Sequence, residues 1–131
     1  MARTTPNGDS KQCVTHCLDC YRTCIETAMA HCLEAGGEHV EPAHFRLMVN
    51  CADICRTTAD FMLSESEFRT RLCALCADVC EACAESCRDI GDMDECMLAC
   101  ELCASSCSAM ASPTRPLQRE SLLTHPKSLL P

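Results

Sequence analysis

The chain has 131 residues, 16 of them cysteine, and a formal net charge of -8 at pH 7. With no Trp, one Tyr and three Phe, it cannot build a large aromatic core. Between Cys13 and Ala111, 17 acidic residues face only 6 arginines, which argues against nucleic acid or an anionic membrane as a partner. The N-terminus is polar and lacks a secretory signal, so we expect a cytoplasmic, reducing location, where cysteines serve as metal ligands more often than as disulfides.

The first two predicted helices have clear boundaries. Ser10 is a suitable N-cap for a helix that runs to about Ala35, where two glycines stop it. Pro42 is favourable as the first residue of a second helix, which extends to about Leu63. No strand-like alternation or internal proline interrupts either segment.

Capping residues also indicate where the third and fourth predicted helices begin. Ser64 and Glu67 have the spacing of a capping box and open the third helix, which ends at Gly91. Asp92 and Glu95 resemble a second box and open the fourth. Because the connections are short, neighbours are expected to be antiparallel. The sequence therefore predicts an all-α, antiparallel up-down four-helix bundle.

The chain divides into three predicted parts. Residues 1–9 form a flexible N-terminus, residues 10–111 form the bundle, and residues 112–131 form a tail that contains four of the six prolines. No apolar run approaches the roughly 20 residues that a membrane span requires.

Cysteines recur along each helix at alternating spacings of four and three, the spacing of a bundle seam. Fifteen of the sixteen fall on four such stripes, and Cys32 alone lies off them, one position past His31. The stripes are Cys13, Cys17, Cys20, Cys24, Thr27, His31; His44, Met48, Cys51, Cys55, Thr58, Met62; Cys73, Cys76, Cys80, Cys83, Cys87, Ile90; and Met93, Cys96, Cys100, Cys103, Cys107, Met110.

Three interpretations of this sulfur-lined core compete. Cysteine as a small buried hydrophobe explains one or two seam positions, but fifteen would leave the core short of volume. Disulfides within a stripe would be strained, because Cβ atoms one turn apart are about 5–6 Å from each other and a disulfide requires about 3.8 Å, although bridges between helices remain open. Metal ligation fits best, since two opposed metal–thiolate bonds span roughly 4.6 Å.

Charge and ligand type favour Cu(I) among the metals. Thiolates bind metal deprotonated, and burying so many unpaired negative charges is prohibitive. Cu(I) bridged by thiolates approaches one ion per sulfur and a neutral core, and soft sulfur ligands prefer it. A tetrahedral zinc site needs four ligands converging on one point, which a ladder along one helix does not offer. Zinc or another soft ion is the second choice, and iron–sulfur clusters are the third.

The chain resembles the copper storage proteins, cysteine-lined four-helix bundles that bind many Cu(I) ions. The resemblance is carried by CVTHCLDCYRTC, NCADIC, CALCADVCEACAESC and CMLACELCASSC, and it covers about residues 10–111. It implies a homotetramer, the cytosolic branch of the family, and Cu(I) entry at one open end. It also implies a ligand role for the fifteen seam cysteines, with Cys32 as an additional candidate.

The end of an up-down bundle where the first helix stops gathers softer, weaker ligands. We interpret this end as the entry mouth for copper, and the candidate ligands there are His31, Cys32, His44, Met48 and Met93, with Met29, Met97 and His39 nearby. The opposite end gathers Cys13, His16, Met62 and Met110, as a second opening or a plug.

Storage and buffering of copper is the predicted function, and the chain is not expected to be an enzyme. Sequestration of zinc or cadmium is the alternative. A cysteine-based redox enzyme needs one or two low-pKa thiols that are set apart, whereas these cysteines are repeated in an acidic body. A carrier of a single ion would not need fifteen ligands.

Overall fold

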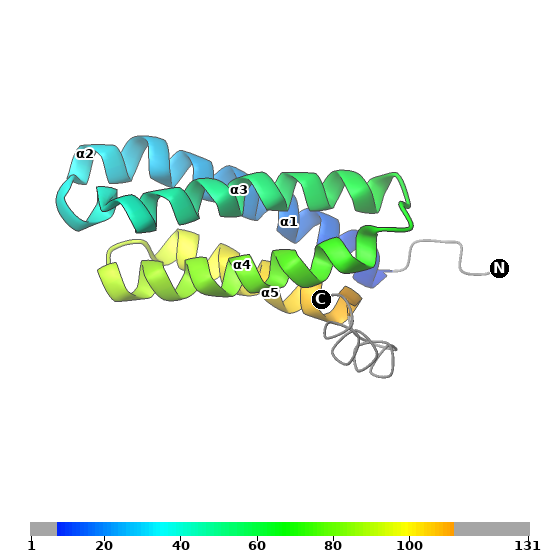
Figure 1. Ribbon diagram of the computed structural model, residues 1–131. Helices are drawn as coiled ribbons and strands as arrows, with labels where there is room; N and C mark the ends of the chain where they lie inside the picture. Colours follow the sequence, from blue (N-terminus) through cyan, green and yellow to red (C-terminus); the bar gives the residue numbers. More distant parts are fainter. Residues whose placement is uncertain (1–7, 112–131) are drawn as a thin grey trace, which may run out of the picture.

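The computed structural model describes residues 8–111, in which four helical rods form an antiparallel up-down bundle (Figure 1), as predicted. Residues 1–7 and the predicted tail at 112–131 lie outside the described part. Of the predicted flexible N-terminus, residues 1–9, Gly8 and Asp9 are already helical, so Ser10 lies within the first helix and not at its start. The rods are α1 (Gly8–Glu26), continued by a π-helical segment (Thr27–Cys32) and α2 (Leu33–Ala35); α3 (Pro42–Leu63); α4 (Arg69–Ile90); and α5 (Asp94–Ala111). A 3₁₀ turn, Gly37–Val40, leads into α3. Packing follows the ring order α1, α3, α4, α5.

Capping explains the predicted boundaries that are confirmed. The Glu41 side chain accepts a hydrogen bond from the backbone N–H of His44 at 3.0 Å, and Pro42 occupies the first turn of α3, where no N–H is needed. The first rod and α4 stop at glycines in the left-handed region, with φ of 68° at Gly36 and 89° at Gly91.

The predicted start of α4 is wrong by about five residues, and that of α5 by about two. Ser64 caps the end of α3, and Glu65 turns the chain with a φ of 56°, so the expected capping box does not form and α4 begins at Arg69. Asp92 likewise has a φ of 63°, and α5 begins at Asp94. Both acidic residues take left-handed conformations that no capping box allows.

The π-helical segment changes which side chains of the first rod face the core. A π turn takes one more residue than an α turn, so the stripe that continues from Cys24 passes through Ala28 and Cys32, both 0% exposed. Thr27 and His31, the predicted seam residues, are only partly buried. Cys32 is therefore in the core, and all sixteen cysteines line it.

The core of the bundle is made of sulfur and small side chains. Its buried apolar members are the sixteen cysteines, three methionines and the alanines Ala28, Ala52, Ala59, Ala77, Ala84 and Ala104. The off-seam acids Asp53, Asp60, Asp78, Glu81, Glu85 and Glu101 are exposed, and so they contribute to a solvated surface.

The antiparallel arrangement gives the bundle two different ends. We call the end where α1 and α2 stop and α5 begins the His31 end, and the end where α3 stops and α4 begins the Met62 end (Figure 1). Within residues 8–111, no helix combines the length and the apolar character that crossing a bilayer requires.

Candidate metal site

All sixteen thiols are free and lie inside the bundle, each no more than 1% exposed. Sulfur atoms of neighbouring cysteines are 3.3 Å apart at the closest, between Cys24 and Cys96, and 3.9 Å apart for pairs such as Cys103 and Cys107. These separations are well beyond a disulfide bond of about 2.05 Å. They match the edge of about 3.8 Å expected for a tetrahedron of sulfurs around an ion with 2.3 Å bonds.

Fourteen of the cysteines form five sets whose sulfur atoms all lie within 4.8 Å of one another. From the Met62 end to the His31 end, the sets are Cys13, Cys73, Cys107; Cys17, Cys76, Cys103, Cys107; Cys20, Cys55, Cys80, Cys103; Cys20, Cys24, Cys51, Cys100; and Cys24, Cys83, Cys96, Cys100. Each set shares at least one sulfur with the next, so the sets form a continuous file along the bundle axis.

The expectation that four thiolates would not converge is wrong. Four of the five sets contain four sulfur atoms, and each of those draws on at least three helices. The expectation considered one helix at a time, whereas the convergence arises between helices: Cys20, Cys55, Cys80 and Cys103 come from α1, α3, α4 and α5.

The thiols of the core interact with one another strongly enough to change their acidity. Hydrogen bonding from Cys103 and other neighbours raises the pKa of Cys55. Burial raises the pKa of Cys32, with a further increase from the charges of Cys96 and Cys83. Because thiolates are the ligand form, metal loading has to displace these protons.

Methionine sulfur caps the file at both ends. At the His31 end, the Cys32 thiol donates to Met93 Sδ at 3.6 Å, and the Cys87 thiol donates to Met48 Sδ at 3.9 Å. Neither cysteine belongs to a set of three or more ligands within residues 8–111. At the Met62 end, the Cys73 thiol donates to Met62 Sδ at 3.6 Å.

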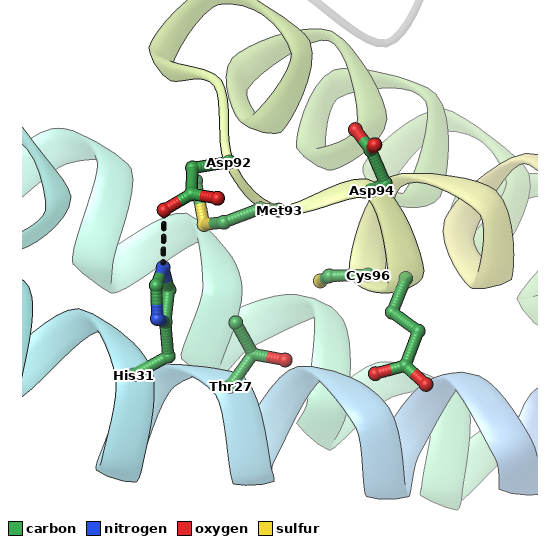
Figure 2. Close-up of a pocket in the computed structure, with 7 residues that line it drawn as sticks. Thr27, His31, Asp92, Met93, Asp94 and Cys96 are labelled. Carbon is green, nitrogen blue, oxygen red and sulfur yellow. Dashed lines mark ion pairs between the residues drawn. The ribbon is translucent and has the colours of Figure 1, made fainter.

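A half-open pocket of about 330 Å³ lies at the His31 end (Figure 2). It is lined by Thr27, His31, Asp92, Met93, Asp94, Glu95 and Cys96. His31 Nε2 is 3.6 Å from a carboxylate oxygen of Asp92, and the two side chains are 40% and 83% exposed. The pocket thus connects an acidic rim, which attracts cations, with a methionine and a cysteine of the core.

His44 is fixed at the same end with one ring nitrogen free. Its side chain is buried, and a hydrogen bond of 2.7 Å joins its Nδ1 to Ser86 Oγ. Its Nε2 is buried without a partner. Burial lowers the pKa of His44, which favours the neutral ring that ligates metals. A bonded Nδ1 and an open Nε2 are the usual arrangement of a metal-binding histidine.

The remaining residues named for the two ends are less deeply placed. The ring of His39 packs edge-on against that of His31 at 5.0 Å, Met97 is partly buried, and Met29 is 48% exposed on the surface. At the Met62 end, His16 Nδ1 lies 2.6 Å from Ser106 Oγ. The two serine partners were missed by the sequence analysis, although each directly precedes a seam cysteine in a repeated Ser-Cys pair.

The sequence of this chain is similar to those of known proteins. A sequence model of the copper storage proteins matches residues 7–112. The uncharacterized cysteine-rich protein YhjQ of Bacillus subtilis (strain 168) is 38% identical over 87 residues, which are 66% of this chain and 79% of that protein.

Two solved structures are also similar. The Nmul_A1745 protein of Nitrosospira multiformis shares 51% identity at a TM-score of 0.77, over 79% of this chain and 94% of that one. The Cu(I)-bound copper storage protein BsCsp3 shares 37% identity at a TM-score of 0.74, over 79% of this chain and 99% of that one. The fold is thus that of a metal-binding four-helix bundle. The chain belongs to the copper storage protein family.

Proposed function

We propose that this protein stores and buffers Cu(I), binding many ions along the file of thiolates. One observation carries the proposal: fourteen buried thiols form five sets that share sulfur atoms from one set to the next. Shared sulfurs are what bridging thiolates require, and a file of bridged ions is a store rather than a single site. The Cu(I)-bound structure of BsCsp3, a bundle of the same family, supports the choice of metal.

Charge balance favours Cu(I) over a divalent ion in this core. One divalent ion in each of the five sets brings ten positive charges to fourteen thiolates and leaves four buried charges uncompensated. One Cu(I) for each thiolate leaves none. Buried uncompensated charge is costly, so the monovalent ion is the better match. Sequestration of zinc or cadmium remains the second candidate, because the four-sulfur sets have the size of a tetrahedral site.

The proposed ligands are all sixteen cysteines, together with His31, His44, Met48 and Met93 at the His31 end. The pocket at that end and the free Nε2 of His44 support the view that copper enters there. Thioether and imidazole bind Cu(I) less tightly than thiolate does, so they suit transfer into the file rather than retention.

Storage also accounts for the features that an enzyme or a single-ion carrier leaves unexplained. All sixteen cysteines are buried to almost the same extent, so burial does not distinguish one of them as a reactive thiol. A carrier of one ion needs two or three ligands. We therefore propose a protein without catalytic turnover.

We further propose that the chain works in the cytoplasm as a homotetramer. Reduced thiols suit a reducing compartment. Leu75 on α4 and Leu98 and Leu102 on α5 are about half exposed and supply apolar surface for contacts between chains. Light scattering that gives the mass of one chain would contradict the tetramer.

Anaerobic titration of the reduced protein with Cu(I), against a competing chromophoric chelator, tests the storage function. We expect on the order of ten to sixteen ions per chain, near one per thiol, counted by native mass spectrometry. Parallel titration with Zn(II) should saturate at about five or fewer ions, at most one per thiol set. Saturation at one or two Cu(I) ions contradicts storage. If the protein binds more Zn(II) than Cu(I) ions, and with higher affinity, sequestration of zinc or cadmium is favoured instead.

A further inference from the structure

Helix α3 differs from the other three rods in the ligands that it brings to the core. It carries only two cysteines, Cys51 and Cys55, and its other buried seam positions are occupied by His44, Met48, Thr58 and Met62. Three of the five thiol sets contain no residue of α3. Where α3 adds no thiolate, it places neutral side chains beside the file.

At the Met62 end, the outermost thiol set lacks a fourth member. Cys13, Cys73 and Cys107 come from α1, α4 and α5, and their sulfur atoms lie within 4.8 Å of one another. Met62 comes from α3, is 7% exposed, and has its Sδ 3.6 Å from the Cys73 thiol. That distance is close to the edge of about 3.8 Å expected for four sulfurs around one metal ion.

The position at the end of the file explains why a thioether suits it better than a thiolate. A thiolate in the middle bridges two ions, which share its negative charge. At the end there is no further ion, so a fourth cysteine would add a buried charge without a cation to balance it. A methionine adds a soft sulfur ligand and no charge. A leucine fills similar volume but offers no lone pair.

We infer that Met62 is a Cu(I) ligand, which completes a terminal four-sulfur site with Cys13, Cys73 and Cys107. The inference rests on the proposed copper storage function and adds a donor outside the thiol sets. The site closes the file at the Met62 end, where copper that enters at the His31 end stops.

Selenomethionine labelling with X-ray absorption at the selenium edge tests this ligand directly. The background is Met48→Leu with Met93→Leu, which removes the other two buried thioethers of the core. In this protein, fully loaded with Cu(I), we expect a selenium–copper distance of roughly 2.4 Å, slightly longer than a metal–thiolate bond. Adding Met62→Leu should abolish it, and adding Met29→Leu, at a half-exposed surface position, should leave it unchanged.

A second experiment measures how tightly the protein binds copper. Met62→Leu alone should weaken the tightest-bound copper by about tenfold or more in chelator competition, with the helical circular dichroism unchanged. Absence of a selenium–copper signal in the background protein, or its persistence after Met62→Leu, overturns the inference. The storage function is judged separately by the ion count: ten or more ions without a selenium signal removes Met62 and leaves storage intact.

Discussion

The two ends of the bundle use the same residue types in different arrangements. Each end has a histidine that is hydrogen-bonded through Nδ1 to a serine of the neighbouring helix, His16 to Ser106 and His44 to Ser86. Each end also has a buried methionine whose sulfur contacts a thiol.

The difference between the ends lies in how many sulfurs converge. At the Met62 end the outermost cysteines form a set of three beside a thioether, whereas at the His31 end Cys32 and Cys87 each have one thioether for a partner and join no larger set among the described residues. Since affinity rises with the number of soft ligands, ions should move from the His31 end toward the Met62 end. Copper ions can thus move in one direction along the file without a conformational change of the protein.

The largest expected effect is on the rate of copper uptake. Replacing His44 by Gln together with Met48 by Leu should slow Cu(I) loading about 10- to 100-fold, because the weak ligands that we propose pass copper inward are lost. Capacity should change little. Stopped-flow transfer from a Cu(I)–chelator complex measures the rate.

The matched pair at the other end is the control for this variant. His16→Gln with Met62→Leu should load at the rate of the unmodified protein. Equal loading rates for all three proteins would remove the assignment of the entry mouth.

A smaller effect is expected on affinity. Cys73→Ser removes a member of a three-thiol set and should raise the dissociation constant of the tightest ions about tenfold. Cys87→Ser should alter that constant by less than about threefold, since Cys87 belongs to no set of three or more ligands among the described residues. Chelator competition at low copper loading separates the two variants, and a larger loss for Cys87→Ser reverses the proposed direction.

The smallest effect concerns the stability of the copper-free protein in acid. Burial lowers the pKa of His44, so below about pH 6.5 the unfolded chain binds a proton that the folded chain resists. The free energy of unfolding should therefore fall with decreasing pH, by at most about 1.4 kcal/mol per pH unit for this one group.

Urea unfolding at pH 7 and pH 5, with reductant and chelator present, measures this dependence. His44→Gln should flatten it. Facing His44 are Cys96 and Glu41, which oppose the shift, and His39, which adds to it. The same slope in His44→Gln as in the parent would assign the effect to other groups.

Sequence reasoning predicted the bundle and its lining because both depend on spacing along single helices. Pro42 and Glu41 define the start of α3, and the stripe from Cys73 to Cys87 lies in the core as predicted. The π-helical turn was not predictable, since no Gly or Pro marks it, and it moves Cys32 inward and His31 outward.

The start of α4 and the thiol sets show two other limits. Ser64 and Glu67 have the spacing of a capping box, but the conformation of Glu65 redirects the chain. The convergence of four sulfurs depends on how neighbouring helices face each other, which no single stripe specifies. Which residues ligate copper stays a prediction.

A core without large aliphatic side chains affects the stability and the degradation of the copper-free protein. Among residues 8–111, no Leu, Ile, Val or Phe is fully buried. The buried apolar core of the empty bundle is therefore sulfur and alanine, and larger side chains such as Ile25, Phe45 and Ile54 pack against it only partly buried. Ions that bind only the folded form stabilise it by mass action. We expect the empty chain to open more often and to be degraded first. Cellular abundance of the protein would then follow copper supply without any transcriptional control.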